Sequence, residues 1–237
     1  VMTAPHIGNT GMNAVDNESS KIWVAGFVVR NPSTLTSNWR SEKDLEAELI
    51  AQNIIGLAGI DTRALTRHLR NRGSMRVGIF SGVELTREEM IAEVKKTAPM
   101  SGAFLVADVS TPFPYVVSAV GEKKFVVAAL DLGIKSATPR ALADRGVEVH
   151  VLPFNSTVDE IIALNPAGVF LSNGPGDPAT MLETIEVVRE ILSRKIPIFG
   201  ICFGHQILGR ALGFETYKLA FGHRGINQPV IDKNTGK

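Results

Sequence analysis

The second half of the chain alternates short apolar runs with helical patterns. The run FVVAALD at 125–131 is continuous, as expected of a strand that is covered on both faces. Similar runs predict three further strands, at 147–152, 167–172 and 196–201. Helical patterns fall between and after these strands, at 139–145, 157–164, 180–194 and 206–213. The alternation predicts an α/β fold with a parallel, doubly wound sheet and helices on both faces.

Local signals mark the ends of these helices. Thr157 precedes its helix and Glu160 follows three residues later, which is the spacing of a capping box. Pro139 suits the first turn of its helix, and Gly146 ends that helix. Ligands bind such sheets at the carboxyl ends of the strands, so we expect the functional residues there.

The first half is less regular and predicts a smaller α+β domain. Helical patterns cover 43–52 and 62–72, and the runs WVAGFVV (23–29) and MRVGIF (75–80) predict strands. The stretch STPFPYVVSAVGEKK (110–124), with two prolines and a glycine, separates the two halves. We therefore expect an N-terminal domain, a linker and a C-terminal domain at 1–110, 111–124 and 125–237.

Charge and composition exclude several classes of partner. The chain has 25 basic and 24 acidic residues, which gives no electrostatic case for a nucleic acid or an anionic membrane. Arg63, Arg67 and Arg70 share one helix face. Because the net charge of the whole chain is close to zero, a solvated or partner-binding face is favoured over a phosphate site. We find no apolar run of membrane-spanning length and no signal pattern. A single cysteine excludes an internal disulfide, so we expect a cytoplasmic protein.

Cys202, the only cysteine, lies in the pattern G-x-C-x-G between a predicted strand and a helix. A strand that turns sharply into a helix strains the corner residue, and small neighbours relieve the crowding, as at serine nucleophile elbows. The helix N-terminus favours a thiolate, and backbone N–H groups beside it can hold an oxyanion. A small buried core residue is the alternative, but the flanking glycines favour a nucleophile.

The loop SNGPGDP (172–178) follows another predicted strand. Its prolines make it rigid, and its glycines allow the backbone to approach a ligand closely. A plain tight turn is the alternative. Because this loop and Cys202 follow adjacent strands of the predicted sheet, we expect them to line one crevice.

The histidines give no clear general base. His205 lies three residues after Cys202 on the same helix, which is a poor position for proton transfer, so a structural role is favoured. His223 lies on a loop near the chain end and is a weaker candidate for the base. The other histidines fit structural or surface roles: His6, His68 and His150. The sequence contains no His-x-Glu pair.

These motifs resemble those of the class I, or triad, glutamine amidotransferases. GICFGHQILG (200–209) is similar to their nucleophile motif, and LSNGPGDP (171–178) is similar to their glutamine-site loop. Five further stretches resemble the carbamoyl-phosphate synthase small-subunit family: PHIGNTGMN (5–13), ESSKIWVAGFVVR (18–30), SNWR (37–40), GIDTRALTRHLRNRG (59–73) and FGHRGINQPV (221–230). The resemblance implies a C-terminal sheet of the class I amidotransferase type.

The resemblance also implies a chemistry. Cys202 attacks the side-chain amide of glutamine, releases ammonia and forms a glutamyl thioester, which is hydrolysed to glutamate. Gly174 and Gly176 match the family's glutamine-binding loop, and Gly176 with Phe203 would help to form the oxyanion hole. Gln206 matches another glutamine contact. Family members commonly carry leucine where this chain has Phe203; the contact is through the backbone, so we expect little change.

Partners follow from the same resemblance. Ammonia passes to a large subunit, which uses ATP, Mg and bicarbonate to make carbamoyl phosphate for arginine and pyrimidine synthesis. The small subunit itself implies no cofactor and no metal. Its N-terminal domain, which has no catalytic motif, would supply docking surface for the large subunit in a heterodimer.

The chain departs from the family at both ends. The His-Pro-Glu stretch that supplies the family's base and its orienting glutamate has no counterpart after Cys202, and the family's first strands have none before PHIGN. We therefore interpret the chain as an internal fragment that lacks its catalytic base. Two alternatives remain, another class I amidotransferase subunit and a catalytically dead scaffold.

Overall fold

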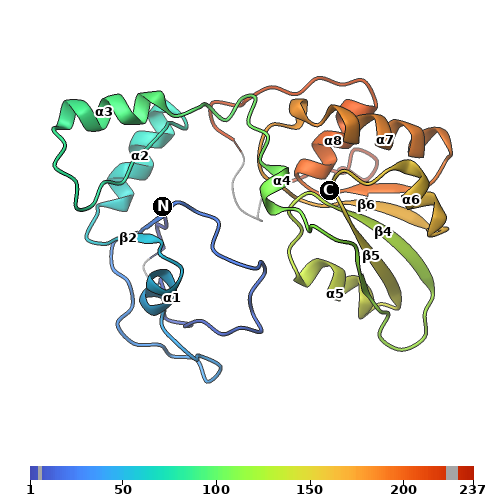
Figure 1. Ribbon diagram of the computed structural model, residues 1–237, viewed down its shortest axis with the longest axis horizontal. Helices are drawn as coiled ribbons and strands as arrows, with labels where there is room; N and C mark the ends of the chain where they lie inside the picture. Colours follow the sequence, from blue (N-terminus) through green and yellow to red (C-terminus); the bar gives the residue numbers. More distant parts are fainter. Residues whose placement is uncertain (5–6, 223–228) are drawn as a thin grey trace.

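The computed structural model describes residues 1–4, 7–222 and 229–237. Figure 1 shows a layered α/β unit in the second half of the chain and a more open arrangement of short elements in the first half. The α/β unit is built on one sheet of five strands in the order β3-β5-β4-β6-β7. Their bounds are β3 Tyr115–Val117, β4 Phe125–Asp131, β5 Val147–Pro153, β6 Gly168–Leu171 and β7 Ile198–Gly200.

The four predicted strands are confirmed, and they run parallel to one another. The sheet as a whole is mixed, because β3 pairs antiparallel with β5. This edge strand lies inside the stretch 111–124 that we expected to be a linker. Its short apolar run covers an edge of β5 that would otherwise present unpaired backbone groups. The opposite edge is β7, where Phe199 keeps 66% of its surface exposed.

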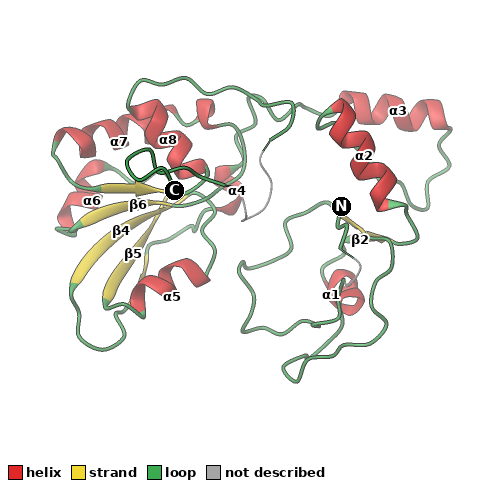
Figure 2. Cartoon of the chain, turned by 180° about the vertical axis from the view of Figure 1, so that it is seen from behind, coloured by secondary structure: helices red, strands yellow, loops and turns green. Residues whose placement is uncertain are grey.

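Helices cover both faces of the sheet (Figures 1 and 2). On one face, α5 packs against β5 and β3. The other face is covered by three helices, α6, α7 and α8. The bounds of the four helices are α5 Ala137–Ala143, α6 Val158–Ala163, α7 Leu182–Ser193 and α8 Phe203–Ala211. Each was predicted, but α8 begins three residues earlier than the expected 206, because the chain turns directly from the strand region into the helix at Cys202.

The main hydrophobic core lies between the sheet and these three helices. Leu130 and Leu171 from the strands meet Ile161, Ile191 and Ile207 from the helices, and all five are at most 1% exposed. Each such side chain contributes about 1.5–3 kcal/mol when it leaves water. This core fixes the carboxyl ends of β4, β6 and β7, which is where the predicted functional loops begin.

The first half contains four helices and a two-stranded parallel sheet among the described residues. Their bounds are β1 Gly26–Val28, α1 Leu45–Ala51, β2 Ile55–Leu57, α2 Thr62–Arg72, α3 Arg87–Lys96 and α4 Val106–Val109. The predicted helix at 62–72 is confirmed to the residue. The predicted helix at 43–52 contains the shorter α1, and the predicted strand at 23–29 contains the shorter β1.

The predicted strand at 75–80 is wrong. A strand is held by hydrogen bonds to a neighbouring strand, and residues 75–80 instead lie against α3, where Gly78 approaches Val94. Val77 is 75% exposed, so this apolar run is not a buried strand. We did not predict α3 itself.

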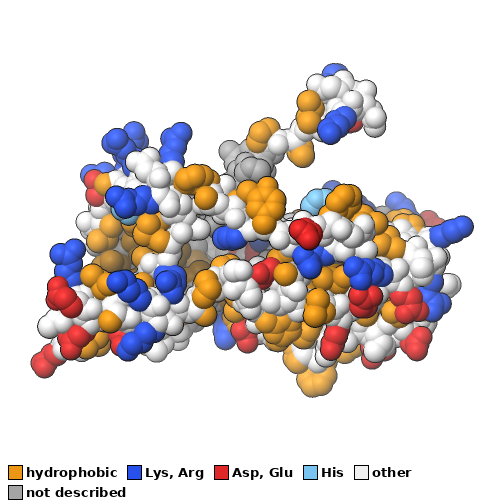
Figure 3. All heavy atoms as spheres, turned by 90° about the horizontal axis from the view of Figure 1, so that it is seen from above, with side chains coloured by type: hydrophobic (Ala, Val, Ile, Leu, Met, Phe, Trp, Pro, Cys, Tyr) orange, Lys and Arg blue, Asp and Glu red, His pale blue; other side chains and the backbone are white. Residues whose placement is uncertain are grey.

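The surface mixes charges of both signs, as Figure 3 shows for one face. Among the helices of the described residues, none combines the length and the apolar character that a membrane crossing requires.

Candidate active site

Cys202 sits at a strained corner between β7 and α8. It is the N-cap residue of α8, with φ 53° and ψ −110°, and its side chain is exposed. Residues other than glycine rarely adopt a positive φ, and such strain persists where the surrounding structure enforces it. The predicted sharp turn from strand to helix is confirmed.

The two glycines beside Cys202 are required by close backbone contacts. A Cβ atom at Gly200 would lie 2.7 Å from the backbone of Gly204 and His205. A Cβ atom at Gly204 would lie 2.2 Å from the carbonyl oxygen of Leu171, at the end of β6. The G-x-C-x-G pattern therefore lets α8 begin directly against the sheet, with the thiol turned outward.

The glycine-rich loop 172–178 lies pressed between two other segments. A Cβ atom at Gly174 would lie 2.0 Å from the carbonyl oxygen of Leu132, just after β4. Gly176 has φ 100°, and a Cβ atom there would lie 2.7 Å from the carbonyl oxygen of Ala103. Both glycines therefore hold positions that no larger residue fits.

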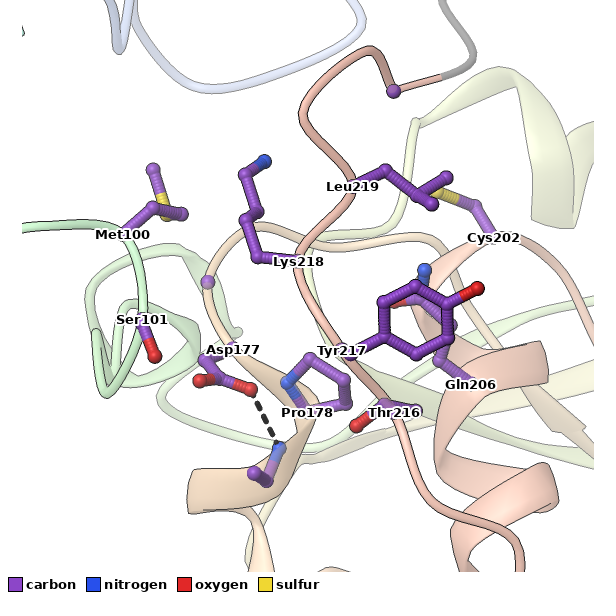
Figure 4. Close-up of a pocket in the computed structure, with 13 residues that line it drawn as sticks. Met100, Ser101, Asp177, Pro178, Cys202, Gln206, Thr216, Tyr217, Lys218 and Leu219 are labelled. Carbon is purple, nitrogen blue, oxygen red and sulfur yellow. Dashed lines mark hydrogen bonds between the residues drawn. The ribbon is translucent and has the colours of Figure 1, made fainter. Parts of the chain in front are cut away.

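A cavity of about 550 Å³ joins the corner and the loop. Figure 4 shows Cys202 and Gln206 on one side and Met100, Ser101 and Asp177 on the other. The remaining lining residues come from the glycine loop, the start of the following 3-10 turn and the chain after α8: Gly176, Pro178, Ala179, Thr216, Tyr217, Lys218, Leu219 and Gly222. The expected crevice between the two motifs is present.

Two family profiles match the chain. Residues 1–79 match the carbamoyl-phosphate synthase small chain, CPSase domain, and residues 128–237 match glutamine amidotransferase class-I. The carbamoyl phosphate synthase small chain of Streptomyces coelicolor is 63% identical over 238 residues. Those of Mycobacterium tuberculosis and Corynebacterium diphtheriae are 58% identical over 243 residues and 55% identical over 241 residues. Over its whole length the chain is similar to carbamoyl phosphate synthase small chains.

All three alignments cover 100% of this chain. The chain spans 63%, 65% and 64% of the length of these three relatives, respectively. The family match therefore extends from end to end of the chain, across both the N-terminal elements and the α/β unit.

The structure places the site residues expected from the family motifs as follows. Cys202, Gln206 and Gly176 line the cavity. Gly174 is not among the lining residues and packs against the backbone of Leu132. The side chain of Phe203 is buried in the core, 2% exposed, so only its backbone is available to a ligand. Within the described part of the chain, the backbone N–H groups of Gly176 and Phe203 have no hydrogen-bond acceptor.

No histidine lines the cavity within residues 1–4, 7–222 and 229–237. His205 is exposed on α8 outside the cavity lining, and His68 is exposed on α2. His150 lies 3.0 Å from Glu148, and this hydrogen bond is the main reason that the pKa of the Glu148 carboxyl is lowered. His6 and His223 lie outside the described residues. The described part of the chain likewise holds no group of three or more side chains suited to a metal ion.

Sequence analysis missed one wall of the cavity. Met100 and Ser101 come from the segment before α4, where neither periodicity nor a motif signals a ligand site. Asp177 belongs to the glycine-rich motif, but its role there was not assigned. Its carboxylate accepts hydrogen bonds from the backbone N–H groups of Gly102 and Ala179, which lower its pKa.

Proposed function

We propose that this protein is the glutamine-hydrolysing small chain of a carbamoyl-phosphate synthase. What supports the proposal is a single observation: an exposed thiol at a strained strand–helix corner shares one cavity with Gly176 and Gln206. The family match supplies the class of reaction. No feature of the described residues favours a different activity.

The proposed reaction has two steps. The Cys202 sulfur attacks the side-chain amide carbon of glutamine, a C–S bond forms, the C–N bond breaks, and the nitrogen leaves as ammonia after taking up a proton. Water then attacks the thioester, which gives glutamate and restores the thiol. In both steps negative charge develops on the carbonyl oxygen under attack, first that of the amide and then that of the thioester. The N–H groups of Gly176 and Phe203, which have no acceptor among the described residues, are suited to stabilise it. Gly174 and Gln206 would hold the substrate.

We further propose that ammonia passes to a large chain, which would use ATP, Mg and bicarbonate to form carbamoyl phosphate for arginine and pyrimidine synthesis. The large chain, and not this one, would bind the nucleotide and the metal. Ammonia protonates and diffuses away in water, so a glutaminase that feeds a synthetase has to dock on it. We place this complex in the cytoplasm, which fits a chain with a single cysteine.

The test uses the full-length gene product together with its large chain. Replacing Cys202 by serine is expected to abolish carbamoyl phosphate synthesis from glutamine and to leave synthesis from added ammonia unchanged. A glutamine-analogue electrophile is expected to label wild-type Cys202 stoichiometrically, as read by mass spectrometry of the peptide. A folded wild-type protein that neither hydrolyses glutamine nor takes the label would contradict the proposal and favour a scaffold role.

A further inference from the structure

One side chain of the glycine-rich loop ties the cavity to the segment that leads out of the N-terminal half. The Asp177 carboxylate accepts a hydrogen bond from the Gly102 N–H at 2.8 Å and another from the Ala179 N–H at 2.9 Å. The backbone N–H of Asp177 in turn donates to the carbonyl oxygen of Ala103 at 2.9 Å. Asp177 is therefore joined to this distant segment twice, by its side chain to Gly102, 75 positions away, and by its backbone to Ala103.

The same segment forms part of the cavity wall. Met100 and Ser101 line the cavity together with Gly176 and Asp177. In Figure 4, Met100, Ser101 and Asp177 lie on the side opposite Cys202. The backbone of Gly176 packs closely against this segment, because a Cβ atom at Gly176 would lie 2.7 Å from the Ala103 carbonyl oxygen. Any shift of residues 100–103 therefore changes the shape of the space in front of the thiol.

The carboxylate has two separable tasks. One oxygen caps the short 3-10 turn Pro178–Thr180 through Ala179, and the dashed line in Figure 4 marks this bond. The other oxygen holds Gly102 and has no part in the turn. An asparagine has one acceptor oxygen, so it cannot perform both tasks.

We propose that Asp177 is a positioning residue for glutamine binding, which seats segment 100–103 as the wall of the cavity that faces Cys202. This inference rests on the proposed function. Asp177 acts through Gly102 rather than on the reacting atoms. Because segment 100–103 leads back to α3 and the rest of the N-terminal half, the position of that half and the shape of the glutamine cavity are coupled.

The test compares Asp177→Asn with wild type in the full-length protein bound to its large chain. The KM for glutamine is expected to rise about tenfold, the change that corresponds to one lost hydrogen bond to a charged group, while kcat changes less than twofold. Asp177→Ser is the second variant, because a serine hydroxyl can still cap the turn through Ala179 but is too short to hold Gly102. It is expected to raise KM by a similar factor. The matched control is Asp159→Asn, an exposed carboxylate on α6, which should leave KM unchanged.

A second readout does not depend on turnover. Hydrogen exchange at the Gly102 amide is expected to become faster in both Asp177 variants, whereas exchange in β4 and β6 stays as in wild type. An unchanged KM in the two variants would overturn the inference while leaving the glutaminase proposal intact. So would a loss of kcat and melting temperature together without a selective rise in KM. If the wild-type protein does not hydrolyse glutamine at all, the proposed function fails, and the positioning role fails with it.

Discussion

At the scale of single residues, the site depends on positions where no side chain fits. Gly204 lets α8 start against the end of β6, and Gly174 and Gly176 let the neighbouring loop lie flat between two other segments. The pattern G-x-C-x-G predicted the first of these contacts, because crowding at a strand–helix corner is a local effect. It could not predict the contact of Gly176 with Ala103, which joins residues 73 positions apart in sequence (176 − 103).

Adding a methyl group at Gly204 tests this requirement. Gly204→Ala is expected to lower the free energy of unfolding by about 1–3 kcal/mol, because the new Cβ atom would overlap the Leu171 carbonyl. Gly209→Ala is the matched control on the same helix, where nothing lies within 4 Å of the added atom. It is expected to stabilise the protein by up to about 1 kcal/mol through helix propensity. Urea unfolding of both variants measures the difference, and equal effects would refute the packing argument.

At the scale of elements, sequence signals succeeded where they were local and periodic. The capping box of α6 was predicted and is present, since Thr157 accepts from the Glu160 N–H and the Glu160 carboxylate accepts from the Thr157 N–H. An identical box, Thr86 with Glu89, begins α3, which we did not predict, and this helix buries none of its residues. The strand expected at 75–80 failed because pairing depends on a partner strand, which composition does not reveal.

The α6 capping box is expected to make stability depend on pH. Hydrogen bonds from Thr157 lower the pKa of Glu160 from its ordinary value of 4.5, so the folded state favours the ionised carboxylate. The contribution is complete above that ordinary value and is lost as the pH falls through the lowered value. Glu160→Ala should therefore reduce the urea midpoint at neutral pH, and the difference from wild type should shrink below pH 4.5.

The corresponding box on α3 provides the control for this measurement. Glu89 has a pKa lowered in the same way, but α3 buries none of its residues. Glu89→Ala is therefore expected to fray α3 with a much smaller change in the global urea midpoint. A loss as large as that of Glu160→Ala, or one that does not vary with pH, would contradict the interpretation.

At the scale of the whole molecule, several hydrogen bonds among the described residues join the N-terminal half to the α/β unit, and two of these ties are made by carboxylate side chains. One is the contact of Asp177 with Gly102. The other is Glu18, which accepts a hydrogen bond from the Ala137 N–H at 2.8 Å and so caps α5 from 119 positions away. Ser136, the N-cap residue of α5, makes no side-chain cap of its own and donates instead to the Asn17 carbonyl oxygen. Neither tie was predicted, because each joins residues that no periodic pattern relates.

Removing the second tie should loosen the N-terminal half without unfolding the sheet. Glu18→Ala is expected to speed hydrogen exchange at the Ser136 and Ala137 amides several-fold. The Ala137 N–H loses its carboxylate acceptor, and the Glu18 backbone carbonyl that accepts from the Ser136 N–H is then held less firmly. Exchange in β4 should stay unchanged, since its core contacts are elsewhere. Glu84→Ala, an exposed carboxylate in the same half, serves as the control and should change neither region. Unchanged exchange at Ala137 in the Glu18 variant would show that the tie carries no stability.

The open edge of the sheet has a practical consequence for anyone who handles these residues as an isolated polypeptide. Among the residues that the structure describes, β7 pairs on one side only, and the Phe199 side chain on it is largely uncovered. Unpaired backbone groups next to an apolar surface are a template for association with another copy. Protein concentration, rather than temperature, would then decide how soon such a sample aggregates. Turbidity measured over a series of dilutions would reveal this aggregation at temperatures below the unfolding transition.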